Sequence, residues 1–284
     1  MESATISFPI FGEGFSLDIP NYITVFGFRL YLYSLFVAAG FILAALYLLR
    51  RRDALELTKD NVFDMVIMAV PCGLVGARIY YVVFNFSHYF GSDDPLGIFR
   101  LREGGLAVYG GIIASGIAFR VYSRIKKIPI GKLLDAAGFG LLIGQAVGRW
   151  GNFLNREAYG VETKVPWRMG LTTHAGTLYV HPTFLYESLW NIAGLVFLHF
   201  LSKGRGRKYP GQFFLLYVSW YGLGRFFIEG IRVDSLYIGN TDVRASQLLA
   251  AFSCLAAAAL LIRTQVLTRK KDTLKADAES NPPD

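Results

Sequence analysis

Seven long apolar runs constrain this chain more than any other feature of its sequence. The first, YLYSLFVAAGFILAALYLL, contains no charged side chain. A helix needs about 20 mostly apolar residues to cross a bilayer, and a helix satisfies its backbone hydrogen bonds internally. Charged residues make up only 18% of the 284 residues, below the ~25% of ordinary soluble domains. The sequence therefore predicts an all-α integral membrane protein with seven transmembrane helices, whose approximate cores are 31–49, 62–84, 105–122, 133–150, 183–201, 211–228 and 246–262.

Basic residues are concentrated in alternate connections between these runs. The connections after the first, third, fifth and seventh runs are rich in Lys and Arg, as in the RRR of residues 50–52, whereas the others carry few. By the positive-inside rule, the N-terminus lies outside and the C-terminus is cytoplasmic. The first 28 residues contain no Lys or Arg, so no cleavable signal peptide is expected. We expect one membrane domain over residues 1–268 and a cytoplasmic, disordered tail over 269–284.

Polar side chains in or beside the runs gather at one predicted depth, in the outer leaflet. They are Tyr33, Arg78, Tyr109, Arg149, Asn152, His181, Tyr186, Glu187, Tyr221, Arg225, Glu229 and Arg232. The last four are spaced by four, four and three residues, which places them on one helix face. Arg225 and Glu229 are therefore expected to pair while facing a shared cavity. Such groups are costly in hydrocarbon unless they are paired or functional.

Structural readings remain open beside the functional ones. Arg78 and Arg149 suit interfacial anchors, and Glu229 suits a simple counter-ion of Arg225. His181 and Pro182 suit the start of a helix. Tyr33, Tyr186 and Tyr221 suit an interfacial belt of tyrosines, and Asp64 and Asp135 suit helix-end roles. Gly110 and Gly111 suit close helix packing, although their backbone N–H groups could alternatively approach a ligand.

The predicted chemistry is the binding of an anionic lipid. Arginine is the side chain best suited to bidentate contact with phosphate, and lipid phosphate lies at the depth of the polar cluster. The sequence contains no GxxxxGK[ST] or HExxH motif and no recognisable Ser/His/Asp triad, so neither ATP nor a metal nor another cofactor is expected. Cys72 and Cys254 lie in apolar runs, which favours buried free thiols over a disulfide or zinc site. The net charge of +8 reflects the basic residues that set the orientation in the membrane, so it does not predict nucleic-acid binding.

The segment GRWGNFLNREAYG, residues 148–160, resembles the signature of the bacterial prolipoprotein diacylglyceryl transferases, Gly-Arg-x-Gly-Asn-Phe-x-Asn-x-Glu-x-x-Gly. It matches at every fixed position. The segments GARIYYVVF, REGGLAVYGG, HPTFLYES and YGLGRFFIEGIR are similar to other family segments and follow in the same order. The resemblance covers residues 31–262 and implies seven spans with the N-terminus outside.

The resemblance also implies a reaction and its location. Enzymes of this family move the diacylglyceryl group of phosphatidylglycerol to the lipobox cysteine of a prolipoprotein signal peptide. The products are a thioether-linked lipid and glycerol 1-phosphate, in the first step of lipoprotein maturation. The expected location is the bacterial cytoplasmic (inner) membrane, with the active site facing the outer leaflet. The expected partners are phosphatidylglycerol, the prolipoprotein and membrane lipid.

The resemblance implies roles for particular residues. Those expected to act in catalysis are Arg149, Arg225, Tyr109, Glu229, Asn152 and Glu157. Those expected to bind substrate are Arg149, Tyr33, Arg78, Gly110, Gly111, Gly160, His181, Glu187 and Arg232. Arg149 matches the arginine that binds the lipid headgroup, and Arg225 matches a second arginine required for activity.

The chain departs from the family pattern at Tyr109, where family members often have a histidine that has been proposed as the base for the thiol. A phenol, with a pKa of about 10, is a poor base at neutral pH. Our hypothesis is that Tyr109 hydrogen-bonds the phosphate or the thiol while arginines stabilise the thiolate. The alternative is that the substrate phosphate accepts the proton. A transporter or binding protein for an anionic lipid or solute is the alternative to the enzyme, although the sequence shows no internal repeat.

Overall fold

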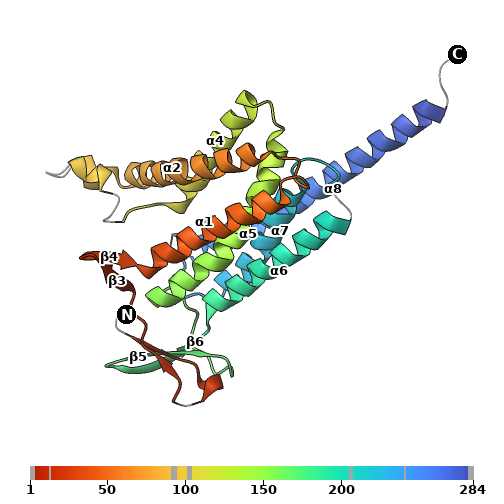
Figure 1. Ribbon diagram of the computed structural model, residues 1–284. Helices are drawn as coiled ribbons and strands as arrows, with labels where there is room; N and C mark the ends of the chain where they lie inside the picture. The colour runs from red at the N-terminus through yellow and green to blue at the C-terminus, as the bar shows by residue number, and fades with distance from the viewer. Residues whose placement is uncertain are drawn as a thin grey trace. The chain divides into compact units, whose positions relative to one another are not determined.

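All seven predicted runs form long helices in the structure, a computed structural model that describes residues 4–12, 14–90, 95–100, 104–204, 207–239 and 241–280 (Figure 1). The long helices are α1 (Leu32–Arg51), α2 (Lys59–Phe84), α4 (Val108–Ile125), α5 (Ile130–Asn155), α6 (Thr183–Gly204), α7 (Gln212–Glu229) and α8 (Ala245–Ser280). Three short helical segments are η1 (Pro9–Phe11), α3 (Phe86–Phe90) and η2 (Pro95–Phe99). The last long helix, α8, continues to Ser280, through most of the segment predicted to be a tail.

Contacts divide the chain into two compact units, and the single membrane domain over residues 1–268 stays a prediction. Unit 1 comprises residues 1–47 and 135–284, and unit 2 comprises residues 48–134. Most of α1, most of α5 and the whole of α6, α7 and α8 belong to unit 1, whereas α2, α3 and α4 belong to unit 2. Each unit is described below by its own contacts.

Five of the long helices are long and apolar enough to cross a membrane, as judged over the described residues. They are α1, α2, α5, α6 and the part of α8 from Ala245 to Thr268. The other two, α4 and α7, have 18 residues each. Polar side chains lower their hydropathy, because α4 contains Arg120 and Arg124 and α7 contains Arg225 and Glu229. The chain is thus a mostly helical membrane protein with several apolar helices.

Specific polar contacts fix where two helices begin. The start of α2 is a capping box, in which Thr58 Oγ1 accepts from the Asn61 N–H at 3.1 Å and Asn61 Oδ1 accepts from the Thr58 N–H at 2.9 Å. The start of α7 is capped by Asp135 of α5, which accepts from the N–H groups of Gly211 at 2.9 Å and Phe214 at 3.0 Å. The predicted helix-end role of Asp135 is confirmed, although the helix that it caps is not its own.

A four-stranded antiparallel sheet corrects the all-α prediction. Its strands are β1 (Thr5–Ser7), β2 (Ser16–Leu17), β5 (Met169–Thr173) and β6 (Gly176–Val180), in the order β2-β1-β5-β6. The central pairing joins distant parts of the chain, with Ile6 opposite Leu171. These two side chains form a buried cluster with Phe153 at the end of α5 and Phe184 at the start of α6. The sheet therefore packs on the end of α5, which carries the signature segment, and on the start of α6.

A second, two-stranded sheet precedes the first long helix. It consists of β3 (Tyr22–Val25) and β4 (Phe28–Tyr31), and α1 follows β4 without an intervening residue. The two-residue turn has positive φ at both positions, 49° at Phe26 and 80° at Gly27. The Leu32 N–H donates to the Asn21 carbonyl at 2.9 Å, which ties the base of the hairpin to the first turn of α1.

Candidate active site

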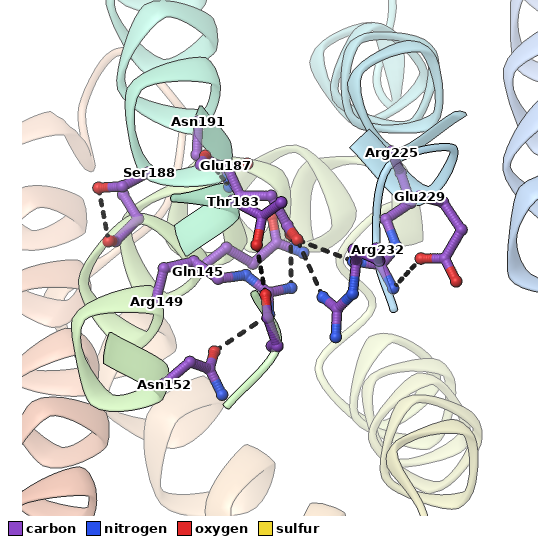
Figure 2. Close-up of polar contacts among 12 residues, drawn as sticks. Gln145, Arg149, Asn152, Thr183, Glu187, Ser188, Asn191, Arg225, Glu229 and Arg232 are labelled. Atoms are coloured by element: carbon purple, nitrogen blue, oxygen red, sulfur yellow. Dashed lines mark hydrogen bonds and ion pairs between the residues drawn. The ribbon is translucent and has the colours of Figure 1, made fainter. Parts of the chain in front are cut away.

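The buried carboxylate of Glu187, in the second turn of α6, binds three arginines (Figure 2). Glu187 Oε2 lies 2.6 Å from Nη2 of Arg149 on α5. Glu187 Oε1 accepts from Nη1 of Arg225 on α7 at 2.8 Å and from Nη1 of Arg232, beyond α7, at 3.1 Å. The residue is only 3% exposed, so these charges interact with little screening by water. Three arginines from separate parts of unit 1 are thus held around one carboxylate.

Two further carboxylates complete the charge balance of this cluster. Glu229 Oε2 lies 2.5 Å from Arg225 Nη2, one helical turn away on α7, which confirms the predicted pair. Asp234 binds Arg232 through two parallel contacts of 2.9 and 2.7 Å. Burial raises the pKa of Asp234, but the hydrogen bond and charge of Arg232 outweigh it and hold that pKa below its usual range. Within the described residues, the cluster therefore pairs three guanidinium groups with three carboxylates.

The signature segment extends the cluster from Arg149 into the loop after α5. Arg149 Nη1 donates to Asn152 Oδ1 at 3.1 Å, and Asn152 Nδ2 donates to Glu157 Oε1 at 2.7 Å. The spacing of three residues puts Arg149 and Asn152 on one face of α5. Because the amide bridges the arginine and the glutamate, Glu157 fixes the orientation of Asn152 and thereby that of Arg149.

Tyr33 lies beside this arrangement, in the first turn of α1. Its ring contacts the backbone of Gly151, where an added Cβ would lie 2.6 Å from Tyr33 Cδ2. Glycine is therefore required at this signature position for α1 to bring the ring against α5. Tyr33 is 37% exposed and lies next in space to the segment that carries Arg149 and Asn152.

An apolar groove of about 320 Å³ has in its lining the residues that directly follow Arg149 and Glu187 in the sequence. Its lining includes Phe36 of α1, Ile143, Val147 and Trp150 of α5, and Ile192 of α6. Trp150 follows Arg149 directly in the sequence, and Trp150 Nε1 donates to Ser188 Oγ at 3.2 Å. Polar groups and an apolar groove thus lie side by side on α5 and α6, the arrangement that an amphipathic ligand requires.

Gly160 and His181 order the loop around the cluster. The Gly160 N–H donates to the His181 carbonyl at 2.9 Å, and Gly160 pairs with Arg232 in an antiparallel bridge. A Cβ on Gly160 would lie 2.7 Å from the Cβ of His181, so the backbones approach too closely for a side chain. His181 Nδ1 lies 3.1 Å from Tyr186 Oη, and burial lowers the pKa of the imidazole. Gly160 and His181 therefore hold the loop backbone in place, and Gly160 does so beside Arg232.

Arg78 lies in unit 2, where it orders the segment before α4. Its guanidinium donates to the backbone carbonyls of Gly97, Ile98 and Gly104 at 2.7, 2.8 and 2.7 Å. It also stacks near the ring of Tyr89, at 5.3 Å from the centroid, and is 7% exposed. This geometry favours a structural role for Arg78 over the substrate contact or the interfacial anchor that the sequence suggested.

Tyr109, Gly110 and Gly111 form the first turn of α4, also in unit 2. Tyr109 is 48% exposed. A Cβ on Gly110 would overlap the Gly76 carbonyl oxygen and the Tyr80 side chain of α2. The glycine pair thus allows α2 and α4 to pack closely, as the structural reading predicted, and unit 2 by itself leaves the Tyr109 ring accessible.

Two participants were missed by the sequence analysis. Asp234 was signalled only by its position two residues after Arg232. Arg156 occupies a variable position of the signature, and nothing in the sequence marked it. Its buried guanidinium donates to the carbonyls of Ala4, Leu154 and Ile19 at 2.6, 2.7 and 2.6 Å, which joins the N-terminal strands to the end of α5. Burial lowers the pKa of this guanidinium.

Comparisons with known proteins show which family the sequence matches. The family profile described as prolipoprotein diacylglyceryl transferase matches residues 20–263. A phosphatidylglycerol–prolipoprotein diacylglyceryl transferase of Clostridioides difficile is 42% identical over 216 residues, which cover 76% of this chain and 84% of the relative. Proteins of the same name from Enterococcus faecalis and Shouchella clausii are 40% and 37% identical, covering 84% and 88% of this chain and 87% and 91% of the relatives.

The matched region runs from before α1 to about the middle of α8 and contains every residue of the arginine cluster. The identity of about 40% extends over most of this chain and most of each relative. This chain therefore belongs to the prolipoprotein diacylglyceryl transferase family and is a membrane-bound transferase.

Proposed function

We propose that this chain transfers the diacylglyceryl group of phosphatidylglycerol to the thiol of a prolipoprotein lipobox cysteine, the first step of lipoprotein maturation. A carbon–sulfur bond forms as the carbon–oxygen bond to phosphate breaks. The phosphate oxygen keeps the bonding electron pair, and glycerol 1-phosphate leaves. The names of the relatives support this reaction. The observation that carries it is the convergence of Arg149 and Arg225 on Glu187, because the departing group is an anion.

Arg149 and Arg225 are proposed to bind the phosphate and stabilise the charge that develops on it. Their side chains are 19% and 17% exposed, so part of each guanidinium remains accessible while Glu187 fixes its direction. Fixed donors aimed at developing charge lower a barrier because they need no reorganisation during the reaction. Glu187, Glu229 and Arg232 act in this proposal as positioning residues around the two arginines.

The groove beside Trp150 is proposed to accommodate an acyl chain of the donor lipid. Its lining is almost entirely apolar, and it begins one residue from Arg149 along α5. A headgroup bound by Arg149 would place its lipid chains close to this groove. Asn152 and Glu157 orient Arg149, and Tyr33 covers the adjacent face of α5.

The proposed topology has seven spans, an outside N-terminus and a cytoplasmic C-terminus. A helix of 18 residues is about 27 Å long, close to the ~30 Å hydrocarbon core, which supports α4 and α7 as the two further spans. The basic residues of alternate connections support the orientation. The active site then faces the outer leaflet of the bacterial cytoplasmic membrane, where lipid and a translocated signal peptide meet.

Tyr109 is proposed to hydrogen-bond the phosphate or the thiol, while arginines stabilise the thiolate. A free thiol has a pKa of about 8.5, so assistance with deprotonation is useful. The alternative acceptor of the proton is the substrate phosphate itself. Tyr109→Phe separates the two, because it removes the hydroxyl and keeps the ring. Full activity of this variant in the lipidation assay would exclude an essential role for the hydroxyl.

The proposed function is tested by glycerol phosphate release from phosphatidylglycerol in detergent, with a lipobox peptide as acceptor. We expect release that requires the cysteine of the peptide and that Arg149→Ala abolishes. Arg263→Ala, an exposed arginine of α8, is the matched control and should retain activity. Release that is independent of the cysteine would indicate a lipase, and lipid binding without release would favour a transporter or binding protein.

A further inference from the structure

The hairpin of β3 and β4 has one apolar and one polar face. Opposite residues of an antiparallel pair share a face, and faces alternate along each strand. Ile23 pairs with Leu30 and Val25 with Phe28, so one face consists entirely of apolar side chains. All four are exposed, Phe28 most of all at 76%. A two-stranded hairpin has no core of its own to cover such a face.

The opposite face suits a lipid headgroup region. It carries the pairs Tyr22 with Tyr31 and Thr24 with Arg29. The guanidinium of Arg29 lies 5.1 Å from the centroid of the Tyr22 ring. Tyrosine is enriched at membrane interfaces, and a cation there attracts anionic headgroups.

The turn of the hairpin is unfavourable in water. Phe26 is 97% exposed, and its φ of 49° belongs to the left-handed region. Asn or Gly is favoured at this position of a two-residue hairpin turn, because a bulky residue is strained there. An aromatic residue that is both strained and exposed is explained if its side chain is buried in another phase.

The position of the hairpin in the chain indicates which phase this is. The last strand residue, Tyr31, is followed directly by Leu32 of α1, a candidate membrane span. The hydrogen bond from the Leu32 N–H to the Asn21 carbonyl fixes the base of the hairpin at the end of that span. Its apolar face therefore begins at the boundary between headgroups and hydrocarbon.

We propose that the hairpin of residues 22–31 is a lipid-inserting anchor. Phe26 and the apolar face of Ile23, Val25, Phe28 and Leu30 enter the leaflet at the N-terminal end of α1, and Arg29 lies among anionic headgroups. The anchor requires that α1 crosses the membrane, but it does not depend on the transfer reaction.

Photocrosslinking in nanodiscs of phosphatidylglycerol tests the anchor without any turnover. The probe is Phe26→p-benzoylphenylalanine in the full chain, and a lipid adduct is detected by intact mass. The matched control is Ala175→p-benzoylphenylalanine, at the exposed two-residue tip of the β5–β6 hairpin. Burial of one aromatic side chain corresponds to about a tenfold preference, so we expect at least that excess of adduct at residue 26. Equal yields at the two tips, or no adduct at residue 26, would overturn the proposal.

A second pair of variants protects the test against misfolding. Phe26→Asn creates an Asn-Gly turn, which favours the same hairpin and removes the apolar tip. With the probe at position 28 instead, we expect the lipid adduct to decrease severalfold in this background. An unchanged yield would show that the tip does not anchor the hairpin. Crosslinking to an added lipobox peptide in place of lipid would assign the hairpin to the protein substrate and overturn the lipid anchor.

Discussion

Glu187→Gln is the substitution that most directly tests the arginine cluster. The variant keeps the size of the side chain and removes its charge, while three guanidinium groups still surround it at 2.6, 2.8 and 3.1 Å. Hydrogen bonds to a charged group contribute about 1.5–3 kcal/mol each and neutral ones about 0.5–1.5 kcal/mol. Each contact therefore loses about 1 kcal/mol, and the three together lose about 3 kcal/mol.

This loss is expected in both stability and rate. The variant should unfold at a lower temperature, by a few degrees per kcal/mol for a chain of this size. Arg149 and Arg225 would also repel one another without the shared carboxylate. The contacts of these two arginines account for about 2 kcal/mol of the loss, and that loss of alignment on the phosphate corresponds to a decrease of about 30-fold in kcat/KM. We expect the decrease mainly in kcat, because alignment matters most as charge develops on the leaving phosphate.

The assay is lipidation of a lipobox peptide with phosphatidylglycerol at saturating and limiting concentrations, beside a thermal unfolding curve. Glu162→Gln is the matched control, since this exposed glutamate lies outside the cluster. Glu187→Asp retains the charge but shortens the side chain, so it should recover more stability than rate. A wild-type rate in Glu187→Gln would refute the positioning role, and a lower melting temperature with an unchanged rate would reduce Glu187 to a structural residue.

Three further predictions concern single residues. Arg149→Lys retains the charge but loses the planar fork that binds Asn152 and Glu187, so kcat/KM should fall about 100-fold in the same assay. Arg78→Gln should lower the thermal midpoint sharply, because it leaves carbonyls of the segment before α4 unpaired, while the KM for phosphatidylglycerol changes little in the folded fraction. His181 has a folded pKa below its unfolded value of about 6.5, so the unfolded chain binds the proton first and stability should fall as the pH drops below that value. In thermal unfolding between pH 5 and 8, His181→Gln should remove this part of the pH dependence.

The seven helices were predictable from the sequence, because the physical cause lies in local composition. An apolar run in lipid must satisfy its backbone groups within itself, and a helix does so whatever its neighbours are. Local spacing likewise predicted the pair of Arg225 and Glu229, because residues four apart on a helix lie on the same face. The short strands carried no such signal. β1 pairs with β5, and Thr5 lies opposite Thr172, so the hydrogen-bond partners are distant in sequence.

The sequence by itself predicted that arginines and glutamates of several helices gather at one depth, since depth follows from the position of a residue along its span. Only the tertiary structure decided which carboxylate binds which arginine. Glu187 joins Arg149, Arg225 and Arg232 because α5, α6 and the end of α7 converge, and no spacing in the sequence encodes that convergence. The partners of Arg78 were likewise visible only in the structure, where four backbone carbonyls accept hydrogen bonds from its guanidinium. Composition and periodicity specify where a side chain lies along its own element, whereas its partners are set by the packing of elements against each other.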